Sequence, residues 1–310
     1  MMNFEDEKAN MEKIRLCQEI VDEIQAQSRR PVCHLQLSQE TYGIADSHLG
    51  GVPYLPHDGK YPMGDDGQML WLCAQINFAQ MPAVEDFPKE GILQLFLSDF
   101  DYDGGFGLYS GEDGTVQDQW KIYWYPEVDS TVTEEECAAK MPVPWNTEER
   151  LWRVPDEPLK IAFQPVGQEG VNYDDFQFEN LFAEALKKRL PGEEPENYMP
   201  YEIDDETPEN REHPNRKALE QIIEQMKCGG CKMGGYPRYE QDDPRLYDDA
   251  LSAWDTLLFQ LDGDDFTYPC GDIGAKAFIS LNGGTLNFLI RTEDLKKQDF
   301  SKVLAQWACS

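Results

Sequence analysis

The sequence predicts an α+β fold in which helices flank a duplicated, mainly antiparallel β core. Three observations lead to this prediction. Short apolar runs are separated by frequent Gly and Pro turn signals, which is typical of antiparallel strands rather than of βαβ units. Four further segments carry apolar residues at helical spacing. Two stretches repeat the same three sequence elements in the same order, which predicts two halves related by a pseudo-twofold repeat.

The helical segments are defined by apolar residues at three- and four-residue steps. The first is predicted at about 10–27, and two more around 178–186 and at about 214–227. The last is predicted at about 293–308, with Thr292 as its cap. The apolar face of this last helix consists of Leu295, Phe300, Val303, Leu304 and Trp307.

Strands are predicted where short runs rich in β-branched and aromatic residues are bounded by turn residues. They fall at 69–78, 91–100, 120–128, 159–166, 256–262, 275–281 and 285–291. An acidic, Pro-rich stretch at 191–214 is typical of a loop. We therefore predict one domain over residues 1–310. Its parts are the N-terminal helix, a first half of the repeat at about 40–165, a helical and acidic linker at about 175–230, and a second half at about 233–308.

The charge balance narrows the possible functions. The chain has 27 Lys and Arg against 59 Asp and Glu, so its formal net charge is −32. Such a chain repels phosphate backbones and anionic lipids, which argues against nucleic acid and membranes as partners. With 40% hydrophobic and 12% aromatic residues, it can still build a core. The acidic excess favours a basic protein or peptide as partner.

The expected compartment is the cytoplasm. The N-terminal residues lack the basic and apolar regions of a signal peptide, and no apolar run approaches the roughly 18 residues of a membrane helix. In a chain of this kind the eight cysteines are expected to be reduced thiols.

The repeat consists of a Gly-Gly-x-Pro turn, a strand with a central Gln, and a segment that begins with Gly. Its first copy comprises 50–53, 72–77 and 91–96, and its second comprises 234–237, 257–262 and 274–279. Gly51 precedes Gln75 by 24 residues, and Gly235 precedes Gln260 by 25 residues. Equal order and near-equal spacing predict a true duplication.

Gln75 and Gln260 admit two interpretations. An amide inside an apolar strand must satisfy its donors and acceptor. In the structural interpretation each Gln bonds the backbone across the two halves. In the functional interpretation the two amides form the polar floor of a pocket shared by the halves. Asn77, Asp262 and Arg245 are the other candidate residues of such a cleft.

Several motifs together resemble the YwqG-like proteins, a bacterial family also described as the domain of unknown function DUF1963. The motifs are GGVPYLP (50–56), LCAQIN (72–77), GILQLFLSD (91–99), GGYPRYEQDDPR (234–245), WDTLLFQLD (254–262), CGDIGAKAFISL (270–281) and DLKKQDFSKV (294–303). The resemblance covers roughly 40–308, with Cys270 where the family usually has an aromatic residue. It implies an α+β fold with a duplicated antiparallel core and no established activity. More distantly, the Gly-Gly-x-Pro and Leu-x-x-Gln elements resemble eukaryotic proteins of the programmed-cell-death type, some of which chaperone a nascent ribosomal protein.

Asp99, Asp101 and Asp103 match the first half of a calcium-binding loop, D-x-D-x-D-G. Alternate carboxylates of this kind converge on a hard cation. The twelfth position is Ser110 rather than Glu, and the preceding segment is a predicted strand, so an acidic hairpin turn is the other interpretation.

Cys228 and Cys231 form a CxxC motif, which is a redox dithiol in some proteins and half of a zinc site in others. Here the motif follows a predicted helix and no second CxxC exists. Two reduced cysteines in a helix-ending turn are therefore the third interpretation.

Nucleophilic catalysis has little support in the sequence. His48 and His57 bracket the first Gly-Gly-x-Pro turn, and His57 is followed by Asp58, but a His near a turn is typically a surface residue. No G-x-S-x-G elbow, P-loop or dinucleotide fingerprint is present. The acidic residues around Arg245 form either a solvated face or a docking surface for a basic protein. They are Glu240, Asp242, Asp243, Asp248 and Asp249.

These observations favour a non-catalytic cytoplasmic module that binds a peptide or a basic protein, as a chaperone or an immunity protein does. No cofactor is expected. The alternatives are a metal-dependent hydrolase that uses Ca²⁺ or another divalent ion at Asp99, Asp101 and Asp103, and a redox or Zn²⁺ protein centred on Cys228 and Cys231.

Overall fold

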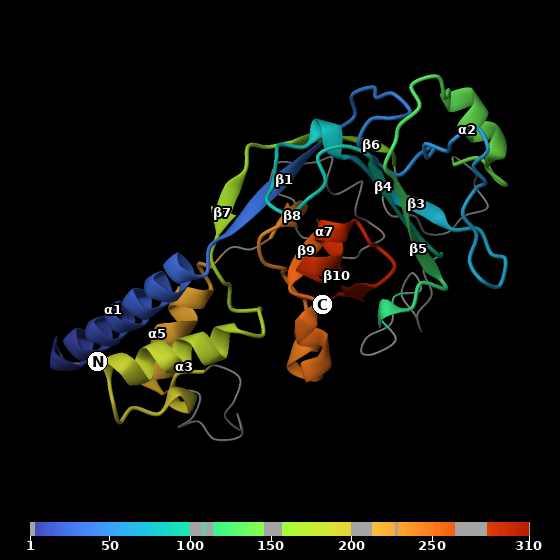
Figure 1. Cartoon of the computed structure of the whole chain (residues 1–310). Helices are drawn as coiled ribbons and strands as arrows, with labels where there is room; N and C mark the ends of the chain where they lie inside the picture. Colours follow the sequence, from blue (N-terminus) through green and yellow to red (C-terminus); the bar gives the residue numbers. More distant parts are fainter. Residues whose placement is uncertain are drawn as a thin grey trace. The chain divides into compact units, whose positions relative to one another are not determined.

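The chain forms an α+β structure in two compact units (Figure 1). The computed structural model describes residues 4–99, 108, 114–145, 157–199, 213–226, 229–263 and 284–309. One unit, the helical unit, comprises Met1–Arg30 and Gln168–Cys228. The other, the sheet unit, comprises Pro31–Gly167 and Gly229–Ser310.

Among its described residues, the helical unit contains the helices α1 (Phe4–Gln27), α3 (Phe178–Arg189) and α5 (Pro214–Ile223), with the 3₁₀ turn η3 (Pro195–Asn197). All three lie where the apolar spacing predicts helices, and the predicted faces are buried. The buried side chains are Cys17, Ile20, Val21 and Ile24 of α1, Phe178, Phe182, Ala185 and Leu186 of α3, and Ala218, Leu219 and Ile222 of α5. Apolar burial is therefore the main stabilising contribution here.

A surface ion pair joins α1 to the end of α3. Arg189 Nη2 lies 2.6 Å from Glu23 Oε2, and Arg189 Nη1 lies 3.1 Å from Glu19 Oε2. The hydrogen bond from Arg189 holds the pKa of the Glu23 carboxyl below its usual range. The arginine stands in the last turn of α3, where a cation also suits the helix dipole.

The sheet unit contains a large sheet in which each strand pair along the main strand order is antiparallel, as predicted. Its order is β11-β10-β9-β8-β1-β6-β2-β3-β4-β5. The strands are β1 (Arg30–Ser38), β2 (His48–Leu49), β3 (Trp71–Asn77), β4 (Ile92–Leu97), β5 (Trp120–Tyr125), β6 (Leu159–Phe163), β8 (Lys232–Gly234), β9 (Thr256–Asp262), β10 (Thr285–Ile290) and β11 (Val303–Ala308). A short strand β7 (Gly167–Glu169) lies off this path, and the 3₁₀ turn η1 (Phe78–Gln80) follows β3.

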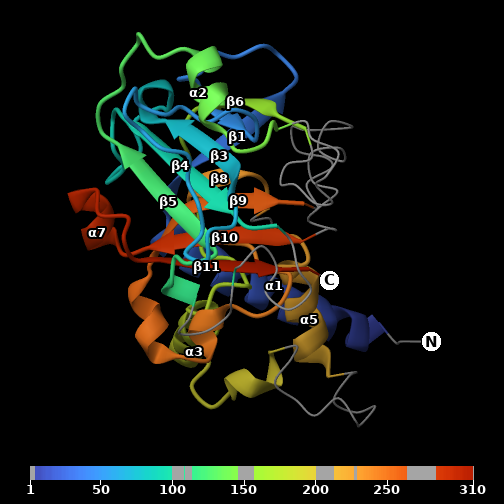
Figure 2. The ribbon, with the colours of Figure 1, turned by 90° about the vertical axis from the view of Figure 1, so that its right-hand side faces the viewer.

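The sheet curls so that strands β3–β5 and β9–β11 enclose one core (Figure 2). In β4, Leu93, Leu95 and Leu97 belong to this core, while the alternate residues point to the other face. The rings of Trp120 in β5 and Phe288 in β10 meet edge to face, with centroids 5.6 Å apart. Because strand side chains alternate, each strand has a second face that needs its own cover.

Two smaller clusters cover the outer face. Helix α2 (Glu134–Lys140) contributes Cys137 to a cluster that includes Tyr54, Trp71 and Phe96. At the other end of the sheet, the 3₁₀ turn η5 (Asp249–Ala253) contributes Leu251, which packs with Leu289 and Leu304. These two covers position the surface loops described below.

The predicted C-terminal helix is wrong beyond its first two turns. Helix α7 (Thr292–Lys297) ends at Gln298, which adopts a left-handed conformation with φ 57°. The following residues form β11, paired with β10 from Ile290↔Val303 to Thr285↔Ala308. The apolar run VLAQWA suits a buried strand as well as a helix, and the ladder with β10 decides between them.

Thr292 is not the cap of α7, which is Arg291. The Thr292 hydroxyl instead donates to Asp255 Oδ1 at 2.8 Å. Strand β1 and helix α2 are further elements that the sequence pattern does not predict. The predicted strand at 275–281 and most of the acidic loop at 191–214 lie outside the described residues.

Candidate functional site

Gln75 lies in the middle of β3, is fully buried, and uses its whole hydrogen-bonding capacity. Its Oε1 accepts from Tyr54 N at 2.8 Å and from Gln94 Nε2 at 2.7 Å. Its Nε2 donates to the carbonyls of Ile44 and Asp46, both at 2.8 Å. The side chain therefore fixes the loops on either side of the Gly-Gly-x-Pro turn onto the sheet.

Gln260 in β9 does the same in the second half. Its Oε1 accepts from Arg238 N at 2.8 Å and its Nε2 donates to Gly230 O at 2.9 Å. A neighbouring amide completes each arrangement. Gln94 Nε2 donates to Tyr54 O, and Asn287 Nδ2 donates to Arg238 O, both at 2.7 Å. The bonds of Gln75 stay within the first half, and these bonds of Gln260 reach Arg238 of the second half and Gly230 just before it, so none of them joins the two halves as expected.

The predicted cleft residues Asn77 and Asp262 also anchor these loops. Asn77 Nδ2 donates to Ala45 O at 2.8 Å. Asp262 Oδ2 accepts from Gly230 N at 2.8 Å, and its Oδ1 lies 2.7 Å from Arg238 Nη1. The carboxylate of Asp262 therefore ties the loop before β8 to the loop after it.

The backbone favours glycine at the first position of each turn. Gly50 has φ 61° and Gly234 has φ 73°, which is the left-handed region. A Cβ on Gly234 would lie 2.4 Å from Pro31 O. The repeated Gly-Gly motif therefore reflects backbone geometry at both turns.

Arg245, the fifth predicted cleft residue, forms a fully buried ion pair with Asp243. Its Nε and Nη2 lie 2.9 Å and 2.7 Å from the two carboxylate oxygens. Its Nη1 donates to Trp254 O at 3.2 Å. Arg245 belongs to the 3₁₀ turn η4 (Pro244–Leu246), and Asp243 caps that turn through Arg245 N. Through these bonds Arg245 links Asp243 to the backbone of Trp254.

The predicted metal and redox residues fall largely outside the described residues. Asp101, Asp103 and Cys228 lie there, whereas Asp99 is exposed at the end of β4 and Cys231 is buried. Within the described ranges, no group of three or more His, Cys, Asp or Glu side chains is placed to hold a metal ion.

His48 in β2 is fully buried and stacks on Tyr42, with ring centroids 4.4 Å apart. Its Nδ1 lies 2.6 Å from Gly50 O. A carbonyl only accepts, so we infer that Nδ1 carries the proton, and Nε2 is buried without a partner. Burial lowers the pKa of His48 to about 4.

His48 is expected to make the sheet unit less stable in acid. The folded-state pKa lies below the unfolded value of about 6.5, so the unfolded chain binds more protons between these pH values. The contribution is fully present above pH ~6.5 and falls by about 3 kcal/mol as the pH drops toward 4. Urea unfolding of the wild type and of His48→Phe across this range would measure it. Parallel stability profiles for the two proteins would contradict the assignment.

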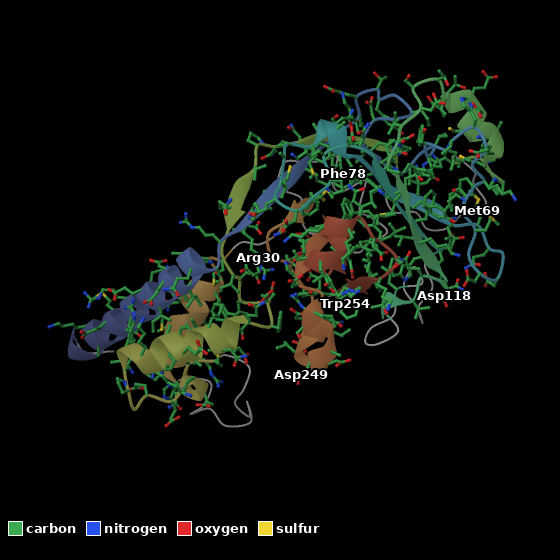
Figure 3. All side chains as sticks on the ribbon, viewed as in Figure 1. Arg30, Met69, Phe78, Asp118, Asp249 and Trp254 are labelled. Carbon is green, nitrogen blue, oxygen red and sulfur yellow. The ribbon has the colours of Figure 1, made fainter. Side chains whose placement is uncertain are left out.

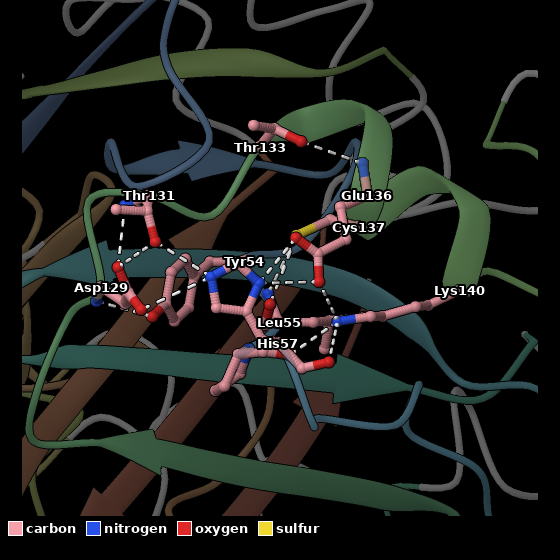
Figure 4. Close-up of polar contacts among 10 residues, drawn as sticks. Tyr54, Leu55, His57, Asp129, Thr131, Thr133, Glu136, Cys137 and Lys140 are labelled. Carbon is pink, nitrogen blue, oxygen red and sulfur yellow. Dashed lines mark hydrogen bonds and ion pairs between the residues drawn. The ribbon is translucent and has the colours of Figure 1, made fainter.

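A polar cluster around His57 joins the loop after the first Gly-Gly-x-Pro turn to α2 (Figure 4). His57 Nδ1 lies 2.8 Å from Glu136 Oε2, and its Nε2 lies 3.0 Å from Thr131 Oγ1 and 3.5 Å from Asp129 Oδ2. Lys140 Nζ donates to Pro56 O at 2.6 Å and to Glu136 Oε1 at 3.1 Å. The hydrogen bond from His57 holds the pKa of the Glu136 carboxyl below its ordinary value.

The sequence contains a signal for this helix that periodicity misses. Thr133 is the N-cap of α2, and its hydroxyl accepts from Glu136 N at 3.2 Å, which matches a Thr-x-x-Glu capping pattern. Beneath the helix, Cys137 Sγ lies 3.3 Å from Leu55 N. Helix α2 is too short to be stable alone. The His57 cluster therefore helps to hold it against the sheet, with the thiol of its own Cys137 buried.

Weakening this fastening should expose Cys137. We expect His57→Ala to raise the rate of Cys137 alkylation several-fold, measured by peptide mass spectrometry in the folded protein. The effect stays moderate because exposed ion pairs contribute little. Lys188→Ala, which removes an exposed ion pair from the helical unit, is the matched control. Equal alkylation rates in the two variants would show that His57 does not hold α2.

The fold and these loops define a class: an α+β protein whose curled antiparallel sheet carries anchored loops on its outer face. The model of the family described as Domain of unknown function (DUF1963) matches residues 47–309, and the chain belongs to this family. No curated protein matches the chain. Within the described ranges, no helix is both long and apolar enough to cross a membrane.

Proposed function

We propose that this chain is a non-catalytic cytoplasmic module that binds a basic protein or peptide, in the manner of a chaperone or an immunity protein. The observation that carries the proposal is the charge. With 59 acidic against 27 basic residues, the chain carries an excess of 32 negative charges that its own Lys and Arg side chains do not neutralise. A field of this sign accelerates encounter with cationic partners and repels anionic ones.

Buried strand amides hold the neighbouring loops in place, which supports a binding surface on those loops. Gln75, Gln94, Gln260 and Asn287 are all buried on the strands and bond to backbone groups of the neighbouring loops. Rigid loops on a sheet scaffold are where proteins commonly place recognition residues. The thiols suit a reducing compartment, because none of the six described cysteines forms a disulfide bond.

The proposal includes an internal duplication of the sheet. Strands β2–β5 and β8–β11 stand at opposite ends of the strand order, in mirrored sequence. Tyr54 and Arg238 each directly follow the proline of their Gly-Gly-x-Pro turn. In both residues the backbone N–H donates to one strand side-chain amide and the backbone C=O accepts from a second. We infer that the two outer-face loops diverged from one ancestor. Helix α2 covers the first, and the second carries the acidic residues around Arg245.

The charge proposal is tested by titrating the full-length protein with an arginine-rich peptide and with an acidic peptide of equal length. We expect binding of the first alone, with affinity falling steeply as salt is raised from about 50 to about 300 mM. Comparable binding of both peptides, or no binding of the basic one, would overturn the proposal.

A further inference from the structure

We infer that the segment 242–254, called the ridge below, is the surface that docks the basic partner, and that it takes an arginine flanked by an apolar residue. This inference rests on the proposed function, because it names the surface through which that function acts. It commits to a guanidinium-bearing segment of a protein as the occupant.

The first observation is an exposed apolar pair at the tip of the ridge. Tyr247 is 75% exposed and Leu246 is 49% exposed. Other large exposed apolar residues of the described chain, such as Met11 and Val116, stand singly. Single exposed apolar residues are ordinary, whereas two adjacent ones form a small apolar patch, and tyrosine is one of the residues enriched in binding hot spots.

The second observation is that the ridge is fixed from below. The Arg245–Asp243 ion pair is wholly buried, and Leu251 packs on the outer face of the sheet. Asp248 caps η5 through Ala250 N at 2.9 Å. The ion pair and the cap bond join residues within the ridge, and Leu251 ties the ridge to the rest of the sheet unit. Leu246 and Tyr247 are thus presented rigidly, which lowers the entropy lost on binding.

The third observation is uncompensated charge around this pair. Asp242, Asp248 and Asp249 form no ion pair with any cation of the described chain. The Tyr247 hydroxyl donates to Asp242, which places a carboxylate beside the ring. The one arginine of the segment, Arg245, forms its ion pair with Asp243. A partner that brings a cation to this surface gains attraction without displacing an internal ion pair.

The combination of a carboxylate and an aromatic face selects arginine over lysine. A guanidinium pairs with a carboxylate through two bonds and stacks on a ring, whereas an ammonium does neither as well. The protein already uses this chemistry at the end of the ridge. The Arg291 guanidinium lies over the Trp254 ring, 5.8 Å from its centroid, and pairs with Asp294. Figure 3 labels Asp249 and Trp254 on this segment.

The experiment compares two triple variants of the full-length protein that change the net charge equally. The ridge variant carries Asp242→Asn, Asp248→Asn and Asp249→Asn, and asparagine at position 248 can still cap η5. The control carries Asp58→Asn, Glu85→Gln and Glu127→Gln, which are exposed residues elsewhere on the sheet unit. Calorimetric titration uses one peptide that contains arginine and leucine and one in which lysine replaces each arginine.

We expect the ridge variant to bind the arginine peptide at least about tenfold more weakly than the control variant does. A Leu246→Ala, Tyr247→Ala double variant should show a similar loss, and wild type should prefer the arginine peptide to the lysine peptide. If wild type binds neither peptide, the proposed function fails. If wild type binds and the ridge and control variants lose equal affinity, the ridge inference alone fails, since the charge then acts without a local surface.

Discussion

Replacement of Gln75 by leucine is expected to lower the free energy of unfolding of the sheet unit by about 4 kcal/mol. The change leaves the N–H of Tyr54 and the carbonyls of Ile44 and Asp46 without their partner in a buried site. Each buried group that loses its partner costs about 1–3 kcal/mol, and some relaxation of the loops offsets part of the sum. The loss is large because one side chain serves four bonds.

Tryptophan fluorescence during urea unfolding measures this prediction selectively. All tryptophans among the described residues belong to the sheet unit. Gln36→Leu is the matched control, because Gln36 is exposed on β1 and its replacement should change stability by about 0.5 kcal/mol or less. If the two substitutions lower the unfolding midpoint equally, Gln75 is not the anchor that its hydrogen bonds indicate.

Replacement of Arg245 by methionine is expected to cost about 3–5 kcal/mol, because it leaves the Asp243 carboxylate buried without its cation. Removing both charges should cost much less, since apolar residues of similar volume can replace a buried ion pair with little loss. The effects of the two substitutions on the free energy of unfolding should therefore be non-additive in a double-mutant cycle. The double variant Asp243→Leu, Arg245→Met should be more stable than Arg245→Met alone.

The same tryptophan-monitored unfolding applies to this cycle, with Trp254 as a local reporter next to the ion pair. Additive effects of the two substitutions would mean that the charges do not interact as the geometry indicates. A double variant that is stable but fails to bind the arginine peptide would show that the ion pair shapes the ridge.

Local sequence patterns predict most of the elements of this fold. The helices at α1, α3 and α5 and the strands β3, β4, β9 and β10 are long enough, or periodic enough, for side-chain spacing to decide. The run from Val303 to Ala308 is too short for spacing to decide. A short apolar segment fits a helix and a buried strand equally until a partner strand is known. Helix α2 has a cap signal but only seven residues, too few for a clear apolar stripe.

The site was harder to predict because its contacts are long-range. Spacing within the repeat identifies Gln75 and Gln260 as paired amides but not their acceptors, which lie in loops. His57 and Glu136 are 79 residues apart, so no local pattern brings them together. Arg245 and Asp243 are neighbours in sequence, yet only the structure shows that their charges cancel in the interior and leave the carboxylates of the ridge uncompensated.

The position of β1 between β8 and β6 has a consequence for biosynthesis. Val32 pairs with Gly234, so this strand waits for a partner that leaves the ribosome 202 residues later. At about 5–20 residues per second, the delay is roughly 10–40 s, far longer than hydrophobic collapse takes. During that time the apolar edge of β1 is open to wrong pairing. This edge of β1 therefore stays without its native partner until the second half of the chain has been made.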